Sequence, residues 1–211
     1  KKLRSGSLHH FRVVVSRTFR MDFFYRSDWF KNLTGFTEES YDVVQRKLEL
    51  VEGPLGQQLR SKVNGRAYYC GDLELVSLTE LRERCVSSGG LPGKLRVSVV
   101  EGEVKKMHSR RENEGSLFQV ASQFNLLEMV SYSVTPEDGV TRYAGDPTQG
   151  PACAVAAGAG TIYRNYFAPC NGRVGQRENS QLDGIRELGL ALAESMGGRN
   201  LRDLWIMRNG Y

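Results

Sequence analysis

The sequence predicts an α/β protein, in which strands and helices alternate along the chain and pack in layers. Residues 94–104 combine valines with polar residues in the manner of a strand. Residues 116–129 are mostly apolar, as in a strand that is covered on both faces. Residues 181–198 place leucine and isoleucine at helical intervals. The 211 residues are enough for one large domain, or for a domain with a smaller attachment.

The expected elements follow one another without an internal repeat. The first elements are an extended stretch at 11–25, a helix at 37–50 with Thr37 as its N-cap, strands within 66–77 around Gly71, and a helix that opens with the capping box of Ser77 and Glu80. A loop at 87–93, the strand at 94–104, a charged connection at 105–115 and the strand at 116–129 follow. The last elements are a helix at 151–167, the helix at 181–198 with Gly197 and Gly198 as its C-terminal cap, and a strand starting at 201.

The loop at 87–93 is the best candidate for a boundary, because it is rich in serine and glycine. We therefore expect an N-terminal α+β portion at residues 1–93 that packs on a core at residues 94–211.

Composition and charge favour an intracellular protein. The net charge is +5, from 29 basic and 24 acidic residues, which is weak evidence for nucleic acid as a partner. No apolar run approaches the ~20 residues that a membrane span needs. The basic N-terminus lacks the apolar core of a signal peptide. We expect a cytoplasmic or intracellular protein without a membrane partner.

The cysteines predict neither a metal site nor a redox motif. The four cysteines form no C-x-x-C pair, and three histidines are too few and too scattered for a zinc cluster. Free thiols suit a reducing compartment, although an even number of cysteines leaves disulfides open. The residues concerned are Cys70, Cys85, Cys153, Cys170, His9, His10 and His108.

The small-residue stretch at 150–160 has two interpretations. Gly158 and Gly160 each cost a helix about 1 kcal/mol relative to alanine, and close packing on a sheet would compensate for that cost. Alternatively, the helix N-terminus near Gly150 and Pro151 offers unpaired N–H groups and partial positive charge to a phosphate. The stretch matches neither the P-loop nor the G-x-G-x-x-G pattern. Both interpretations remain open on the residues alone.

The order of these segments resembles the macrodomain family. The segment FQVASQFN, the loop after it, and the helix QGPACAVAAGAGTIYRNY are similar to the macrodomain strand, turn and Ala/Gly-rich helix that hold ADP-ribose. VVEGEV resembles the family's strand that ends in Gly-Asp-Ile. The similarity covers about residues 95–166. It is strongest to the ADP-ribosyl hydrolases related to poly(ADP-ribose) glycohydrolase, in the branch represented by the Legionella effector MavL and its eukaryotic relatives.

The resemblance implies a three-layer α/β/α macrodomain fold with a mixed central sheet and an N-terminal extension. It also implies a set of ligand-binding residues. Asn125, with Gln123 beside it, matches the position that meets the distal ribose. Gln149 and Gly150 fall in the loop around that ribose and the diphosphate. Glu103 matches the acidic residue that reaches the adenine.

The resemblance places catalytic carboxylates close to the small-residue helix. Asp138 and Asp146 fall in the loop where MavL-like enzymes carry acidic residues near the scissile bond, and Glu128 is a third candidate. Carboxylates suit this chemistry because attack at the ribose C1″ passes through a cation-like transition state. Two structural alternatives stay open, namely that Asp138 is a turn residue in PEDG and that Asp146 is a cap before Pro147.

The sequence therefore predicts an ADP-ribosyl hydrolase that removes ADP-ribose from protein side chains, such as an arginine of ubiquitin. No metal or other cofactor is implied, and ADP-ribose is the ligand or product. The Gln-Glu-Glu signature of the polymer-cleaving enzymes is absent, and the family's later strands and second phosphate loop would be expected beyond Tyr211. Two alternatives are a reader that binds ADP-ribose without cleaving it, and a basic nucleic-acid or protein interaction domain that uses residues 105–111.

Overall fold

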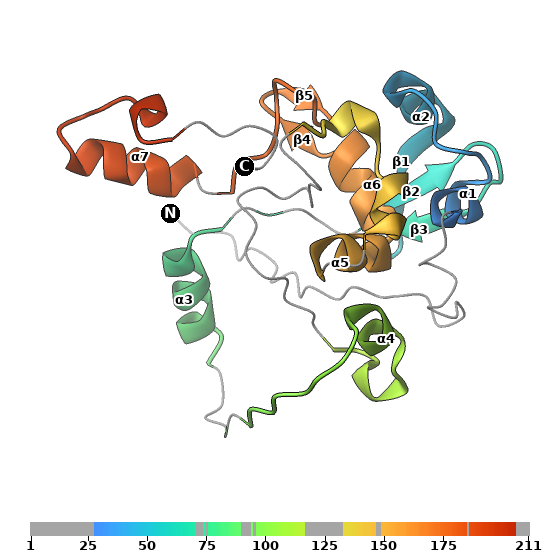
Figure 1. Cartoon of the computed structure of the whole chain (residues 1–211), viewed down its shortest axis with the longest axis horizontal. Helices are drawn as coiled ribbons and strands as arrows, with labels where there is room; N and C mark the ends of the chain where they lie inside the picture. Colours follow the sequence, from blue (N-terminus) through green and yellow to red (C-terminus); the bar gives the residue numbers. More distant parts are fainter. Residues whose placement is uncertain are drawn as a thin grey trace, which may run out of the picture.

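The protein is a mixed α/β chain with small antiparallel sheets (Figure 1). A computed structural model describes residues 28–70, 74, 76–89, 94, 96–116, 133–146, 149–184 and 186–205. The mixture of helices and strands expected from the sequence is confirmed among these residues. The expected strands at 11–25 and 116–129 lie outside the described residues, and so do Gln123, Asn125 and Glu128.

The N-terminal part of the described chain consists of two short helices and a three-stranded sheet. The elements are α1 (Trp29–Thr34), α2 (Tyr41–Lys47), β1 (Leu48–Gly53), β2 (Gly56–Ser61) and β3 (Ala67–Tyr69). The strands form an antiparallel sheet in the order β1-β2-β3, with Leu48 opposite Ser61 and Gly53 opposite Gly56. The turn at Gly53–Gly56 is therefore a hairpin connection.

The expected helix at 37–50 is shorter than predicted. It begins at Tyr41 after the N-cap Ser40, so Thr37 is not the N-cap. It ends at Lys47, because the next six residues form the strand β1, which pairs with β2. Tyr41 and Val44 of this segment are both buried.

The middle of the chain contains α3 (Leu78–Ser87), α4 (Val104–Ser109) and the 3-10 turn η2 (Arg111–Asn113). The capping box of α3 is confirmed, since the Ser77 hydroxyl accepts from the Glu80 N–H and the Glu80 carboxylate accepts from the Ser77 N–H. The expected strand at 94–104 is wrong for the residues that the structure describes there. They form no ladder, and Val97 and Val99 are 78% and 97% exposed.

The remaining elements are mostly helical. They are η3 (Pro136–Asp138), η4 (Thr141–Gly145), α5 (Gln149–Ala157), α6 (Ala159–Tyr166), β4 (Pro169–Cys170), β5 (Arg173–Val174), α7 (Arg186–Ser195) and η5 (Leu201–Asp203). The expected helix at 151–167 is divided in two at Gly158, which has a φ of +53°. The helix predicted at 181–198 is present as α7 and is followed by Gly197 and Gly198 with positive φ. A 3-10 turn occupies the start of the strand expected at 201.

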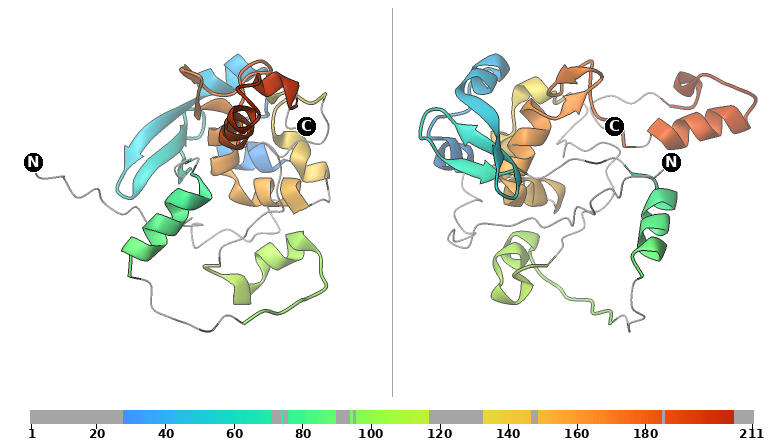
Figure 2. Two further views of the ribbon diagram at one scale, coloured as in Figure 1. Left: turned by 90° about the vertical axis from the view of Figure 1, so that its left-hand side faces the viewer. Right: turned by 180° about the vertical axis from the view of Figure 1, so that it is seen from behind.

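One hydrophobic core joins early and late parts of the chain. Helix α6 packs against β3 and α2, and α5 contacts η4 and α4. Figures 1 and 2 show α5 and α6 beside the sheet, with α3 and α7 standing away from it. The largest fully buried side chains of this core are Trp29, Phe30, Val44, Leu48, Val140, Tyr143, Val155, Ile162 and Tyr166.

The described residues contain antiparallel pairing in both sheets, β1-β2-β3 and β4-β5. The mixed central sheet expected from the macrodomain resemblance is therefore not among them. The N-terminal portion does pack on the later helices, as Trp29 and Val44 share the core with Val155 and Ile162.

Candidate functional site

A hydrogen-bonded loop at residues 133–146 leads into the small-residue helix α5. Its anchor is Glu38, which precedes α2. One carboxylate oxygen of Glu38 accepts from the Val140 N–H at 2.8 Å, and the other accepts from the Thr141 N–H at 2.7 Å. The hydroxyls of Thr141 and Tyr166 also donate to this carboxylate. One half-buried acidic side chain thus fixes the middle of the loop.

Gly139 makes this close approach sterically feasible. It has a φ of +80°, in the left-handed region that favours glycine, and an added Cβ would lie 2.5 Å from an oxygen of Glu38. Gly139 of PEDG therefore permits both the turn and the close approach of the Glu38 carboxylate.

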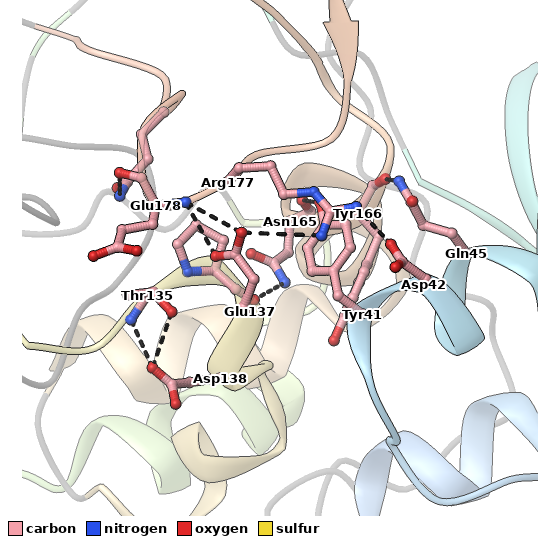
Figure 3. A network of polar contacts seen from close by, with 12 residues as sticks. Tyr41, Asp42, Gln45, Thr135, Glu137, Asp138, Asn165, Tyr166, Arg177 and Glu178 are labelled. Atoms are coloured by element: carbon pink, nitrogen blue, oxygen red, sulfur yellow. Dashed lines mark hydrogen bonds and ion pairs between the residues drawn. The ribbon is translucent and has the colours of Figure 1, made fainter.

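Tyr41, Asn165 and Tyr166 belong to the polar network around this loop (Figure 3). The Asn165 side-chain amide donates to the Pro136 carbonyl at 3.0 Å, and the Tyr41 hydroxyl donates to the Asn165 carbonyl at 2.6 Å. Burial, and then the adjacent charge of Glu38, raise the pKa of Tyr166 well above its usual range. Tyr166 therefore stays protonated and donates to Glu38 across the neutral pH range.

Arg177, which follows β5 in the chain, contacts residues of the same network. Its guanidinium lies 3.8 Å from the ring centroid of Tyr41 and 2.7 Å from a carboxylate oxygen of Asp42. Figure 3 shows it between Asp42 on α2 and Glu137 on η3. The hydrogen bond from Arg177 lowers the pKa of the Asp42 carboxyl. Arg177 thereby connects segments that are more than a hundred positions apart.

Asp138 takes part in a local cap. Its carboxylate accepts from the Thr135 N–H at 2.8 Å and from the Thr135 hydroxyl at 3.1 Å, and the residue is exposed at the end of η3. This geometry supports the turn role that the sequence left open for Asp138.

Asp146 lies where the loop meets α5. It follows η4 directly, its N–H donates to the Tyr143 carbonyl at 3.2 Å, and it is half-buried. Helix α5 begins at Gln149, and the second helical residue, Gly150, is buried. The start of α5 is thus one residue before Gly150, and Pro151 is at its third position. Asp146 therefore precedes the first residue of α5 by three positions in the sequence.

Helix α4 packs against this region. The Lys105 ammonium donates to the Ala144 carbonyl in η4 at 3.2 Å, and Nε2 of His108 lies 3.3 Å from Sγ of Cys153 in α5. Glu103 is the N-cap residue of α4, is exposed, and pairs with Lys106 at 3.0 Å. Glu103, which the resemblance assigns to the adenine, and Gln149 and Gly150, which it assigns to the ribose and diphosphate, thus lie at the starts of α4 and α5, two helices in contact.

Sequence reasoning missed Glu38, Asn165 and Arg177 as members of this network. Their partners are separated from them by up to 135 positions in the chain, so no local pattern could reveal them. Glu38 was part of the segment at 37–50 that was expected to be helical.

No metal-binding chemistry stands out in this arrangement. Across the ranges that the structure describes, no three or more His, Cys, Asp or Glu residues gather as metal ligands would. None of the helices in those ranges combines the length and apolar character needed to cross a lipid bilayer.

The chain is thus a mixed α/β protein in which an acidic loop, held by hydrogen bonds, precedes a small-residue helix. Compared with known proteins, the chain matches no family model, and no curated protein or solved structure is significantly similar to it.

Proposed function

We propose that this chain binds ADP-ribose and hydrolyses an ADP-ribosyl bond on a modified protein, with Asp146 as the principal catalytic carboxylate. The observation that carries the proposal is the fixed loop. Glu38 and Asn165 hold its backbone, and Asp146 ends the loop three residues before the first residue of α5. Catalysis needs carboxylates held in place, because a small displacement from the reacting atoms costs much of the rate.

The helix N-terminus supplies the matching anion-binding feature. The first N–H groups of a helix have no partner within it and carry partial positive charge, which suits a diphosphate. Gly150, which is buried at the second position, has no Cβ that would keep a ligand from the backbone. Glu103 at the start of α4 stays the candidate for the adenine, since α4 packs on α5.

The loop geometry separates the two acidic residues proposed for chemistry. Asp138 is engaged by Thr135, so we assign it a structural role within the loop. Asp146 would then steady the positive charge that develops at the ribose C1″, or activate the attacking water. An arginine leaving group, as on modified ubiquitin, would gain further positioning from pairing with a carboxylate.

The test compares Asp146→Asn with Glu194→Gln, a charge-removing change on the exposed side of α7. ADP-ribose release from an arginine-ADP-ribosylated protein should fall about 100-fold or more in Asp146→Asn, the range typical of a lost acid–base group. It should stay unchanged in Glu194→Gln. Calorimetry with free ADP-ribose should give similar affinities for both variants, because the change affects the transition state more than the ground state.

The other results would identify the alternatives. If the wild-type chain binds ADP-ribose but releases none from any linkage, it is a reader. If it shows no heat of binding and no thermal shift with ADP-ribose, the proposal is wrong. Steeply salt-dependent binding of nucleic acid through α4 and η2 would then indicate the interaction domain.

A further inference from the structure

The contact between α4 and α5 contains a cysteine and a histidine to which the proposed function gives no role. Sγ of Cys153 lies 3.3 Å from Nε2 of His108, within hydrogen-bond reach of a sulfur atom. His108 is buried, with 7% of its surface exposed, whereas Cys153 is half-buried. The pair therefore joins a covered imidazole to a partly accessible thiol.

We propose that Cys153 is a site of oxidative modification, a thiol activated by His108 and reactive toward small peroxides. Thiols react as thiolates, and a neighbouring base that accepts the proton makes the thiolate available near neutral pH. Peroxides are the fitting reagents because they are small enough to reach a half-buried sulfur atom.

His108 has the properties of such a base. Burial lowers the pKa of the imidazole below its usual value, so the ring is neutral at pH 7. A neutral ring nitrogen accepts a hydrogen bond from a thiol and can take its proton as the sulfur begins to react.

The reaction with hydrogen peroxide balances without a further reagent. The Cys153 sulfur attacks one peroxide oxygen, an S–O bond forms and the O–O bond breaks. The second oxygen leaves as water after receiving the thiol proton through His108. The sulfur is oxidised to sulfenic acid by two electrons, and the peroxide is reduced by the same two.

The other cysteines in the described ranges provide the comparison. Cys70 and Cys170 are buried, and the Cys70 thiol donates to the Gln57 carbonyl at 3.4 Å. Cys85 is exposed on α3 and serves as an internal reference for an accessible thiol. The geometry therefore assigns the base-assisted reactivity to Cys153.

Oxidation should also loosen α4. This helix has six residues, and contacts from Lys105 and His108 connect it to η4 and α5. A new oxygen on Sγ occupies space next to His108, so the contact seen here cannot persist. The peptide bonds after Lys105 and Lys106 should become easier for trypsin to reach.

The first experiment measures oxidation of the full chain by dilute hydrogen peroxide. Sulfenic acid is trapped with dimedone, and the rates at Cys153 and Cys85 are followed by peptide mass spectrometry. At pH 6.5 the Cys153 rate should fall about tenfold in His108→Gln, as expected when a thiol loses its base. The Cys85 rate should stay constant. An unchanged or faster Cys153 reaction in this variant would overturn the proposal.

A second measurement needs no substitution and so does not depend on how the variant folds. Below an ordinary thiol pKa of about 8.5, the rate of an unassisted thiol falls about tenfold per pH unit. Cys153 should instead stay near its plateau down to about pH 7. A Cys153 rate that follows the line of an unassisted thiol would contradict the proposal.

The third measurement tests the release of α4. After peroxide treatment, trypsin should cut the wild type after Lys105 or Lys106 severalfold faster, and should cut Cys153→Ser at the same rate with or without peroxide. Unchanged cleavage of fully oxidised wild type would show that α4 is not released. Because ADP-ribose takes no part in these assays, their results are independent of the proposed hydrolase activity.

Discussion

Glu38 is the single side chain that most directly holds the acidic loop in place. Its carboxylate accepts hydrogen bonds from two backbone N–H groups of the loop, at Val140 and Thr141, and from the hydroxyl of buried Tyr166. Hydrogen bonds to a charged group are stronger than neutral ones. Removing the acceptor also leaves these donors partly buried without a partner, which costs more than the lost bonds alone.

We therefore predict that Glu38→Ala lowers the free energy of unfolding by about 2–4 kcal/mol, the range for losing charged acceptors of buried donors. Urea denaturation followed by circular dichroism measures the change. Glu39→Ala is the matched control, because Glu39 forms an exposed pair with Lys47 and such pairs contribute about 0–1 kcal/mol. Equal losses in the two variants would mean that the loop does not depend on Glu38.

Residue-scale features were predictable where both partners are close in sequence. The Ser77–Glu80 capping box follows from a spacing of three residues and is present as expected. Glu38 contacts residues 102 to 128 positions away, so its role depends on the tertiary fold. Asp138 lies between these cases, because PEDG predicted a turn and the structure adds the contact to Thr135.

At the scale of elements, the small-residue helix shows how the chain resolves a local conflict. The sequence predicted one helix with glycines in its interior. The structure instead ends α5 at Ala157 and starts α6 at Ala159, with Gly158 at φ +53° and ψ −109°. Residues with a side chain rarely adopt such a conformation. The break lets α6 change direction and pack its buried face, including Ile162 and Tyr166, into the core.

Gly158→Ala should therefore lower the free energy of unfolding by about 1–3 kcal/mol, the usual cost of a side chain in a disfavoured backbone region. Gly145→Ala is the control, since Gly145 has no positive φ and an added Cβ would meet nothing within 4 Å. Thermal unfolding of both variants gives the comparison. A stabilised Gly158→Ala would indicate that α5 and α6 can join into one continuous helix.

Strands were harder to predict than helices because a strand exists only where a second segment pairs with it. The helix predicted at 37–50 gave way to β1 at Leu48, since pairing with β2 outweighed the helical pattern. The segment at 94–104 has the composition of a strand, yet its described residues have no strand partner there and expose Val97 and Val99. Composition indicates the ability to extend, whereas pairing depends on what lies alongside.

At the scale of the whole molecule, the core depends on both sides of the proposed boundary at residues 93 and 94. Trp29, Phe30 and Val44 from the early part are buried against later helices together with Val155 and Ile162. Helix α3, which precedes the boundary, contributes no buried residue. The chain between the two parts should therefore tolerate a cut, while the parts themselves should stay together.

We predict that a protease-specific sequence placed in α3 after Arg84 can be cleaved without loss of the folded core. The two fragments should elute together in size-exclusion chromatography and separate in urea at the midpoint where tryptophan fluorescence reports unfolding. The reason is that Trp29 is fully buried and its indole N–H donates to the Thr141 carbonyl, so separation exposes it. The uncut protein with the same insertion is the control. If the fragments separate in native buffer while Trp29 stays protected, the parts before and after Arg84 fold independently, because only a self-sufficient core keeps its tryptophan buried after its partner leaves.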